Sequence, residues 1–191
     1  NEISSRHARL AFLLVQGNLE KVFAAPLDVE ARGFVQLGAS HAGAAIECSM
    51  LGAAHSMANP LTARRGVVHG NAVGMCLPAV MRFNAELPEV RSIYAGLARD
   101  AGLAEAPADD ASATEAVIGQ VEKLLSLADF QLTLQQYGFS LEEVPGLAEE
   151  AFGQWTAGFN PRPVSGQDFA KLYASLFAGT ACAEIGFESS S

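Results

Sequence analysis

The fold of this chain is decided by the stretch from Gly38 to Asn84, which reads GASHAGAAIECSMLGAAHSMANPLTARRGVVHGNAVGMCLPAVMRFN. It contains many alanines and glycines, a first histidine, His55, and a second histidine, His69, beyond a segment with proline and glycine. Alanine favours helices, and glycine on a helix lets a neighbouring backbone approach closely. We therefore expect two closely packed helices joined by a turn, with His55 near the end of the first and His69 opening the second.

Helical patterns continue on the N-terminal side of this stretch. The apolar spacing predicts a helix over 4–16, capped by Ser4 or Ser5, a break at Gly17 and a short helical piece over 19–25. Asp28 stands where an N-cap belongs, and no proline follows for many residues. We expect a single long helix over 29–57.

Prolines divide the next part of the chain. Pro60 is expected to end the long helix and to leave 62–66 as a loop, because proline lacks the N–H that a helix interior needs. Pro78 should break or kink the helix that His69 opens, and Asn84 should end it.

The second half carries further helix signals. A helix is predicted over 89–101, followed by an exposed linker over 104–111. Ser112 with Glu115 forms a capping-box pattern and should open a helix that continues to Ala128.

Two more capping-box patterns follow. Ser140 with Glu143 should open a helix to about Ala157, and Ser165 with Asp168 should open the last helix. The sequence contains no persuasive alternation of strand residues and no internal repeat. The expected fold is an all-α multi-helix bundle that forms a single domain over 1–191.

Composition excludes several classes of partner. Half of the 191 residues are hydrophobic and 17% are charged, which is typical of a globular domain with a real core. No run of eighteen apolar residues occurs, so we expect no membrane span. The net charge of -9 argues against nucleic acid and anionic membranes as partners. A small molecule or another protein is the expected partner.

Cysteines indicate a reducing compartment. Cys48, Cys76 and Cys182 are widely spaced, and each lies among apolar residues. This pattern favours three buried free thiols over a disulfide framework or a zinc knuckle. With no signal peptide in the sequence, we expect a cytoplasmic protein.

The spacing of the histidines leaves two interpretations open. His55 and His69 lie fourteen residues apart, which suits either a metal pair or two unrelated residues. In a long helix, His41 would share a face with His55 but stand about 21 Å away, too far to share a metal. His41 is therefore expected to be a packed or hydrogen-bonded residue, and His7 an exposed one.

Other polar and aromatic residues have structural explanations beside functional ones. Arg64 and Arg65 could face a cofactor phosphate, or they could be a solvated pair in a loop. Asn160 and Arg162 are expected to fix the final turn through side-chain hydrogen bonds. Trp155, the only tryptophan, is expected in the core.

Essentially the whole chain resembles the C-terminal helical domain of the iron-containing, group III alcohol dehydrogenases. These enzymes belong to the larger dehydroquinate-synthase-like superfamily. The segments that carry the resemblance are DVEARGFVQLGASHAGAAI (28–46), GAAHSMANPL (52–61), GVVHGNAVGMCLPAVMRFN (66–84) and FNPRPVSGQDFAKLYASLF (159–177).

The resemblance implies hydride transfer between a primary alcohol or aldehyde and NAD or NADP. It implies that His55 and His69 bind the catalytic divalent metal, usually Fe²⁺ and sometimes Zn²⁺. Such a metal acts as a Lewis acid on the substrate oxygen. Imidazole accepts both ions, so the sequence does not choose between them.

The chain departs from the family pattern in two respects. In the family, an Asp and a His complete the ligand set, and both stand upstream of the helix that begins this chain. The nucleotide-binding domain lies further upstream. We therefore expect the chain to be part of a longer enzyme and to be inactive alone, with no catalytic residue beyond the ligands. Asn59 replaces a histidine of many members, and we expect it on the cofactor and substrate side, where it could hydrogen-bond a hydroxyl but not titrate.

Two alternatives stay open. Within the superfamily, the chain could be the corresponding domain of a maleylacetate-reductase-type enzyme. In a different class, it could be a non-catalytic helical domain for assembly or binding. Homo-oligomer formation is possible under each of them.

Overall fold

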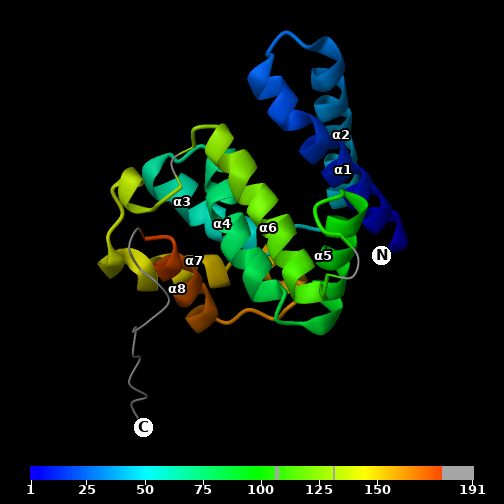
Figure 1. Ribbon diagram of the computed structural model, residues 1–191. Coiled ribbons are helices and arrows are strands. Elements are labelled where there is room, and N and C mark those ends of the chain that lie inside the picture. Colours follow the sequence, from blue (N-terminus) through cyan, green and yellow to red (C-terminus); the bar gives the residue numbers. More distant parts are fainter. Residues whose placement is uncertain (106–107, 131, 178–191) are drawn as a thin grey trace.

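The computed structural model describes residues 1–105, 108–130 and 132–177. Within these ranges it is all helical and contains no strand, which confirms the predicted fold class (Figure 1). The α-helices are α1 (Glu2–Ala24), α2 (Val29–Glu47), α3 (Ala53–Arg65), α4 (His69–Asn84), α5 (Pro88–Asp100), α6 (Asp110–Leu127), α7 (Val144–Phe152) and α8 (Gly166–Ser175). Three short 3₁₀ helices are η1 (Gln135–Tyr137), η2 (Leu141–Glu143) and η3 (Trp155–Phe159).

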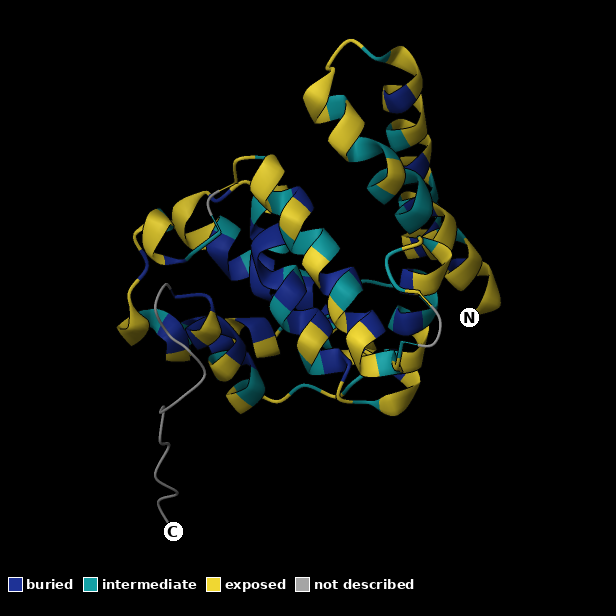
Figure 2. Cartoon of the chain, in the orientation of Figure 1, coloured by how far each residue is buried: buried dark blue, intermediate teal, exposed yellow. Residues whose placement is uncertain are grey.

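The first two helices form an antiparallel hairpin that extends away from the remaining helices (Figure 1). In the rest of the chain, α3 packs on α4 and α7, α5 packs on α6, and α7 packs on α8. Buried residues gather in α3 and α4, whereas the hairpin is mostly exposed or half-buried (Figure 2). The stretch that decides the fold therefore supplies the centre of the molecule.

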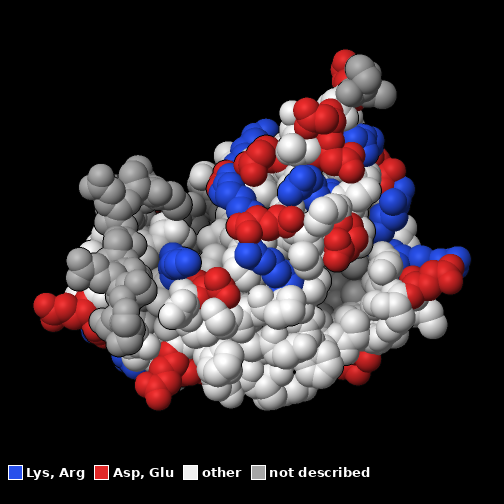
Figure 3. All heavy atoms as spheres, turned by 90° about the horizontal axis from the view of Figure 1, so that it is seen from below, with Lys and Arg blue, Asp and Glu red and all other residues white. Residues whose placement is uncertain are grey.

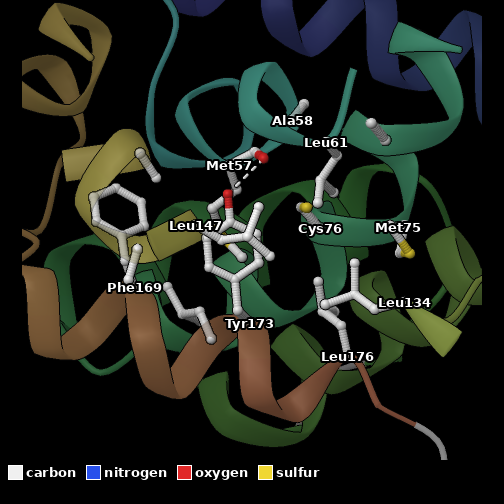
Figure 4. Packing of buried hydrophobic residues seen from close by; sticks show 14 of the residues in the cluster. Met57, Ala58, Leu61, Met75, Cys76, Leu134, Leu147, Phe169, Tyr173 and Leu176 are labelled. Carbon is white, nitrogen blue, oxygen red and sulfur yellow. Dashed lines mark hydrogen bonds between the residues drawn. The ribbon is translucent and has the colours of Figure 1, made fainter. Parts of the chain in front are cut away.

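The main core joins α3 and α4 to α7 and α8. Its largest fully buried side chains include Met57, Leu147, Phe169 and Tyr173. The Tyr173 hydroxyl donates a hydrogen bond of 2.7 Å to the Met57 carbonyl, which the dashed line in Figure 4 marks. A buried hydroxyl without a partner would be costly, so this bond fixes α8 against α3. A second, smaller cluster packs α4, α5 and α6 together around Val117.

The prediction of a single long helix over 29–57 is wrong. α2 ends at Glu47 and α3 begins at Ala53, so His41 and His55 lie in different helices. The Asn160 side-chain oxygen accepts a hydrogen bond of 3.2 Å from the Ala53 N–H and so starts the new helix. The partner lies 107 residues away in sequence, and no local pattern could reveal it.

Pro60 and Pro78 do not end helices. Pro60 lies inside α3 and Pro78 inside α4, and both are buried. A proline in a helix interior loses one hydrogen bond, but burial of its ring in a packed core offsets that loss. Instead, α3 ends at Arg65, and the next residue, Gly66, has a φ of 63°, a left-handed conformation that glycine adopts without strain.

Other helix boundaries and caps also differ from the prediction. α1 runs unbroken past Gly17, since one internal glycine costs only about 1 kcal/mol. Asn1 caps it in place of either predicted serine, and Asp109 caps α6 in place of Ser112. The helix predicted to continue to about 157 ends at Phe152, and η3 follows.

The remaining helix signals are confirmed. α2 begins after Asp28, whose side chain accepts a hydrogen bond from the Ala31 N–H. α4 runs from His69 to Asn84 and α5 ends close to the predicted boundary, before Gly102. Capping boxes form at Ser165 with Asp168, where α8 begins, and at Ser140 with Glu143, where the box opens η2 and α7 follows from Val144.

Loss of the Ser165 cap should destabilise the protein. The Ser165 hydroxyl accepts from the Asp168 N–H at 3.2 Å, and the Asp168 carboxylate accepts from the hydroxyl and N–H of Ser165. Ser165→Ala should lower the free energy of unfolding by about 1 kcal/mol in urea titrations. Ser112→Ala is the matched control, because Asp109 caps that helix, and it should change stability by less than about 0.5 kcal/mol. Equal losses in the two variants would contradict this assignment of the caps.

The same box makes stability depend on pH. Burial acts to raise the pKa of Asp168, but the hydrogen bonds from Ser165 outweigh it and leave the pKa below its ordinary value. The ionised Asp168 carboxylate should therefore make its full contribution to the free energy of unfolding above the unfolded-state pKa of about 4. This contribution should be lost as the pH falls from there through the lower pKa of the folded state.

Surface and thiol predictions have mixed outcomes. No helix in the described ranges is long and apolar enough to cross a membrane. On the face in Figure 3, Lys and Arg lie among Asp and Glu, and a broad area carries no charged side chain. Cys76 is a buried free thiol as predicted, but Cys48 is free and exposed, which corrects its prediction. Cys182 lies outside the described residues.

Candidate metal centre

The two histidines of the central stretch lie in the first turns of neighbouring helices. His55 is the third residue of α3, not near the end of its helix as predicted, and His69 is the first residue of α4. Gly66 reverses the chain after α3, and the buried Val67 anchors the segment that leads back to α4. The imidazole ring centroids of His55 and His69 are 5.5 Å apart, with an angle of 48° between the rings.

The electrostatic environment favours neutral imidazole at His55. Burial, followed by the nearby His69, lowers the pKa of His55 below its ordinary value. The positive end of the α3 dipole lies at the same turn and also disfavours an imidazolium ion. A neutral ring keeps a nitrogen lone pair available, which is the form that binds a metal.

Asn59 lies one turn after His55 on the same helix and is half-buried. Its amide nitrogen donates a hydrogen bond of 3.0 Å to the side-chain oxygen of Gln154. This bond occupies one of the hydrogen-bonding positions of the amide and orients the group. Gln154 is a neighbour that the sequence did not predict, since it lies 95 residues away and no local pattern marks it.

A buried amide pair supports the start of α3. The Asn160 side chain exchanges hydrogen bonds of 2.7 and 3.3 Å with Asn84, and it also donates to the Arg162 carbonyl at 2.7 Å. Together with the bond from Ala53, these contacts tie the ends of α3 and α4 to the segment before α8. The predicted structural role of Asn160 is confirmed.

Arg162 also has the predicted structural role. Its guanidinium donates to the Phe83 carbonyl at 2.8 Å, pairs with Glu86 at 2.8 Å and stacks on the Phe83 ring 3.8 Å from its centroid.

Trp155 is not in the core. It is 66% exposed and meets the exposed Phe159 edge to face, with ring centroids 5.8 Å apart. An open hollow of about 450 Å³ adjoins it, lined by Phe152, Gly153, Gln154, Trp155, Ala157, Gly158, Asn160, Pro163 and Val164. A larger hollow of about 830 Å³ between α4, α6 and α8 contains no histidine. Only the smaller one shares residues with the surroundings of His55 and Asn59.

The two arginines after Thr62 lie in the last turn of α3 and not in a loop. Arg64 pairs with Glu150 at 2.7 Å, and Arg65 pairs with Glu143 at 2.8 Å. Their side chains thus link α3 to α7 and to the turn before it.

The remaining histidines form a second pair. The Nδ1 atoms of His7 and His41 are 2.9 Å apart, and the two rings are half-buried between α1 and α2. The prediction that His41 is hydrogen-bonded is confirmed, whereas His7 is half-buried and not exposed as predicted.

The donor set at His55 and His69 suits a divalent metal but is incomplete. Two imidazoles are good ligands for Fe²⁺ and Zn²⁺, whereas catalytic sites usually have three protein ligands. In the described part of the chain, no group of three or more His, Cys, Asp or Glu side chains gathers at this site.

The chain is similar in sequence to known dehydrogenases and reductases. The 1-propanol dehydrogenase of Salmonella typhimurium is 29% identical over 182 residues, which cover 91% of this chain and 47% of that protein. The lactaldehyde reductase of Escherichia coli K12 is 32% identical over 149 residues, which cover 76% of this chain and 38% of that protein. The chain thus spans about half, or less, of the length of these relatives.

Solved structures share the fold. A 1,3-propanediol oxidoreductase matches with a TM-score of 0.87 and 26% identity, over 93% of this chain and 46% of that one. An alcohol dehydrogenase from Oenococcus oeni matches with a TM-score of 0.85 and 24% identity, over the same 93% and 46%. The model of the C-terminal domain of the Fe-containing alcohol dehydrogenase family matches residues 1–177. The chain therefore belongs to the Fe-containing alcohol dehydrogenase family, and it corresponds to the C-terminal helical domain of these enzymes.

Proposed function

We propose that this chain is the metal-binding helical part of an NAD(P)-dependent alcohol dehydrogenase or aldehyde reductase. The observation that carries the proposal is the distance of 5.5 Å between the imidazole ring centroids of His55 and His69, in a chain that belongs to the Fe-containing alcohol dehydrogenase family. In this proposal both histidines are metal ligands. A divalent metal held there, Fe²⁺ or Zn²⁺, supplies Lewis-acid polarisation of the substrate oxygen.

The backbone around the two histidines is suited to an anionic partner. α3 and α4 both begin at this site, and the N-terminal end of a helix carries partial positive charge. Among the described residues no side chain caps the first turn of α4. This field favours negative charge that develops on a substrate oxygen.

Asn59 orients a hydroxyl group in this proposal. Its amide is held by Gln154, so it presents hydrogen-bonding groups in a fixed direction one turn from His55. An amide does not titrate near neutral pH, so Asn59 serves to position a ribose or substrate hydroxyl and not to carry a proton. The hollow beside Trp155 includes Gln154, the partner of Asn59, and in this proposal its lining contacts the alkyl group of the substrate.

The names of the relatives support a short primary alcohol or aldehyde as substrate. They include a 1-propanol dehydrogenase, an NADPH-dependent butanol dehydrogenase and a lactaldehyde reductase. We therefore expect substrates of about three or four carbons. The described residues contain only two grouped ligands, so the 191-residue chain on its own is expected to bind the metal weakly and not to catalyse.

The test is an activity assay on the full-length protein that carries this chain. Propanal, butanal and lactaldehyde should each be tried with NADH and with NADPH. We expect reduction with at least one coenzyme, loss of activity after treatment with a chelator, and recovery with Fe²⁺ or Zn²⁺. The metal that restores activity at the lower concentration identifies the preferred ion.

Two outcomes would overturn the proposal. If the protein reduced maleylacetate and chelators did not affect this activity, the chain would belong to an enzyme of the maleylacetate-reductase type. A folded protein that neither binds NAD(P) nor reduces any of these substrates would be the non-catalytic helical module.

Two further parts of the proposal concern the environment of the protein. The buried free thiol of Cys76 supports a cytoplasmic location. Exposed apolar side chains on the α1–α2 hairpin, such as Leu27 (92% exposed), support contact with another domain or a second copy.

A further inference from the structure

We propose that His7 and His41 form a second metal site, separate from the pair at His55 and His69, for a divalent transition metal that prefers ligands at right angles. The site joins the two helices of the α1–α2 hairpin. The proposal does not rest on the proposed enzyme function.

The distance between the two imidazoles fits two ligands of one ion. Metal–nitrogen bonds of about 2.0–2.1 Å place two nitrogens about 2.9 Å apart at a right angle and about 3.3–3.4 Å apart in a tetrahedron. The Nδ1 atoms of His7 and His41 are 2.9 Å apart, with 34° between the rings. Right-angle geometry with nitrogen and oxygen ligands is typical of Cu²⁺ and Ni²⁺.

The backbone of the hairpin fixes this distance. Gly38 lies one turn before His41, and a Cβ atom there would approach the Val15 side chain to 2.7 Å and the Ala11 carbonyl to 3.2 Å. Ala11 lies one turn after His7, so the close contact between the helices is directly beside the two imidazoles. Ligands on two packed helices lose little conformational freedom when they bind.

A hydrogen bond holds the two rings in the absence of metal. The Nδ1–H of one ring donates a hydrogen bond to the Nδ1 of the other, so the two Nδ1 atoms already face each other. A metal can bind the donor ring through Nδ1 only if the ring proton is on Nε2. The ring therefore loses its Nδ1 proton to solvent and takes one up at Nε2, and it stays neutral. Both rings are half-buried, so water can reach them.

Water would complete the ligand set. The described ranges contain no group of three or more His, Cys, Asp or Glu side chains that could enclose an ion. Two imidazoles with water ligands suit Cu²⁺ and Ni²⁺ better than Mg²⁺ or Ca²⁺, which prefer oxygen. The net charge of -9 adds a long-range attraction for any cation.

The test separates the two histidine pairs by mutation. In one variant His55 and His69 are alanine, which leaves the hairpin pair, and in the other His7 and His41 are glutamine, which leaves the pair at α3 and α4. Glutamine retains hydrogen-bonding groups, and circular dichroism verifies that each variant is folded. Ni²⁺ binding is measured by isothermal titration calorimetry, with Mg²⁺ as the control ion.

The first variant should bind one Ni²⁺ ion per chain. Replacing either His7 or His41 in it should weaken binding by about 100-fold or more, because even changes beyond the ligands cost about 10- to 100-fold. Bound Ni²⁺ should also raise the Tm, since it cross-links two helices only in the folded protein. Cu²⁺ bound to the first variant should give an electron paramagnetic resonance spectrum with coupling to two imidazole nitrogens.

An affinity for Ni²⁺ that is unchanged when His7 or His41 is replaced would overturn the proposal. So would the absence of Ni²⁺ binding in the first variant while it is folded. Neither result would affect the proposed function, which depends on the metal retained by the second variant.

Discussion

Replacing His69 by alanine in the full-length protein should lower kcat/KM for its aldehyde substrate by about 1,000-fold or more. A Lewis-acid metal contributes several kcal/mol to transition-state stabilisation, and each 1.36 kcal/mol corresponds to a factor of ten in rate. His55→Ala should have an effect of the same order, because the two rings share one site. The double variant should be little worse than either single one, as expected for ligands that act as a unit.

The chain contains a matched control for this prediction. His41→Gln changes a histidine that is half-buried, as His55 is, and that contacts His7 and not the proposed catalytic metal. It should leave kcat/KM within about twofold of the unmodified protein. Full activity in His69→Ala would remove His69 from the site, and a large loss in His41→Gln would show that the hairpin takes part in catalysis.

Asn160→Ala should lower the free energy of unfolding by about 3 kcal/mol. The Asn160 side chain is buried and bonds to the Asn84 amide, the Ala53 N–H and the Arg162 carbonyl. Removing one partner leaves the others buried and unpaired, and each such group costs about 1–3 kcal/mol. The start of α3 would lose the partner of its first N–H, two residues before His55.

Urea unfolding measures this loss, and Asn18→Ala is the control. The Asn18 amide is half-buried and donates to the Leu14 carbonyl, so its removal should cost less than about 1 kcal/mol. In the full-length protein Asn160→Ala should also weaken metal retention, because it loosens the helix that carries His55. Equal stability of the two variants would contradict the role assigned to the Asn160 cluster.

Local patterns in the sequence were sufficient for features that depend on neighbouring residues. The capping boxes at Ser140 and Ser165 and the N-cap at Asp28 formed as expected, because each needs only residues within three positions. The all-helical class followed from periodicity along the whole chain. The position of His69 at the start of a helix was also predicted correctly.

Tertiary contacts decided the features that the sequence analysis missed. Pro60 stays inside α3 because the core encloses it, and α2 ends early because Asn160 starts α3 at Ala53. Ser112 lost the capping role to Asp109, only three residues before it, since either side chain could have capped the helix. These choices depend on packing and on competition between neighbouring caps.

The candidate site shows the same division. His55, His69 and Asn59 were proposed as site residues from the sequence and its resemblance to a family, and their roles stay a prediction. The partners of Asn59 and of the first N–H of α3 could not be predicted, because Gln154 and Asn160 are about 100 residues away along the chain. Trp155 was expected in the core because no aromatic partners in the sequence suggested a stacking platform, yet it is exposed and borders an open hollow.

The central claim is that His55 and His69 hold one divalent metal, and anomalous diffraction tests it most directly. Crystals of the full-length protein grown with Zn²⁺ should be measured on both sides of the zinc absorption edge. We expect one anomalous peak with imidazole nitrogens of both His55 and His69 about 2.0–2.1 Å away. A well-ordered site in which either ring lies beyond bonding distance of every zinc ion would contradict the account.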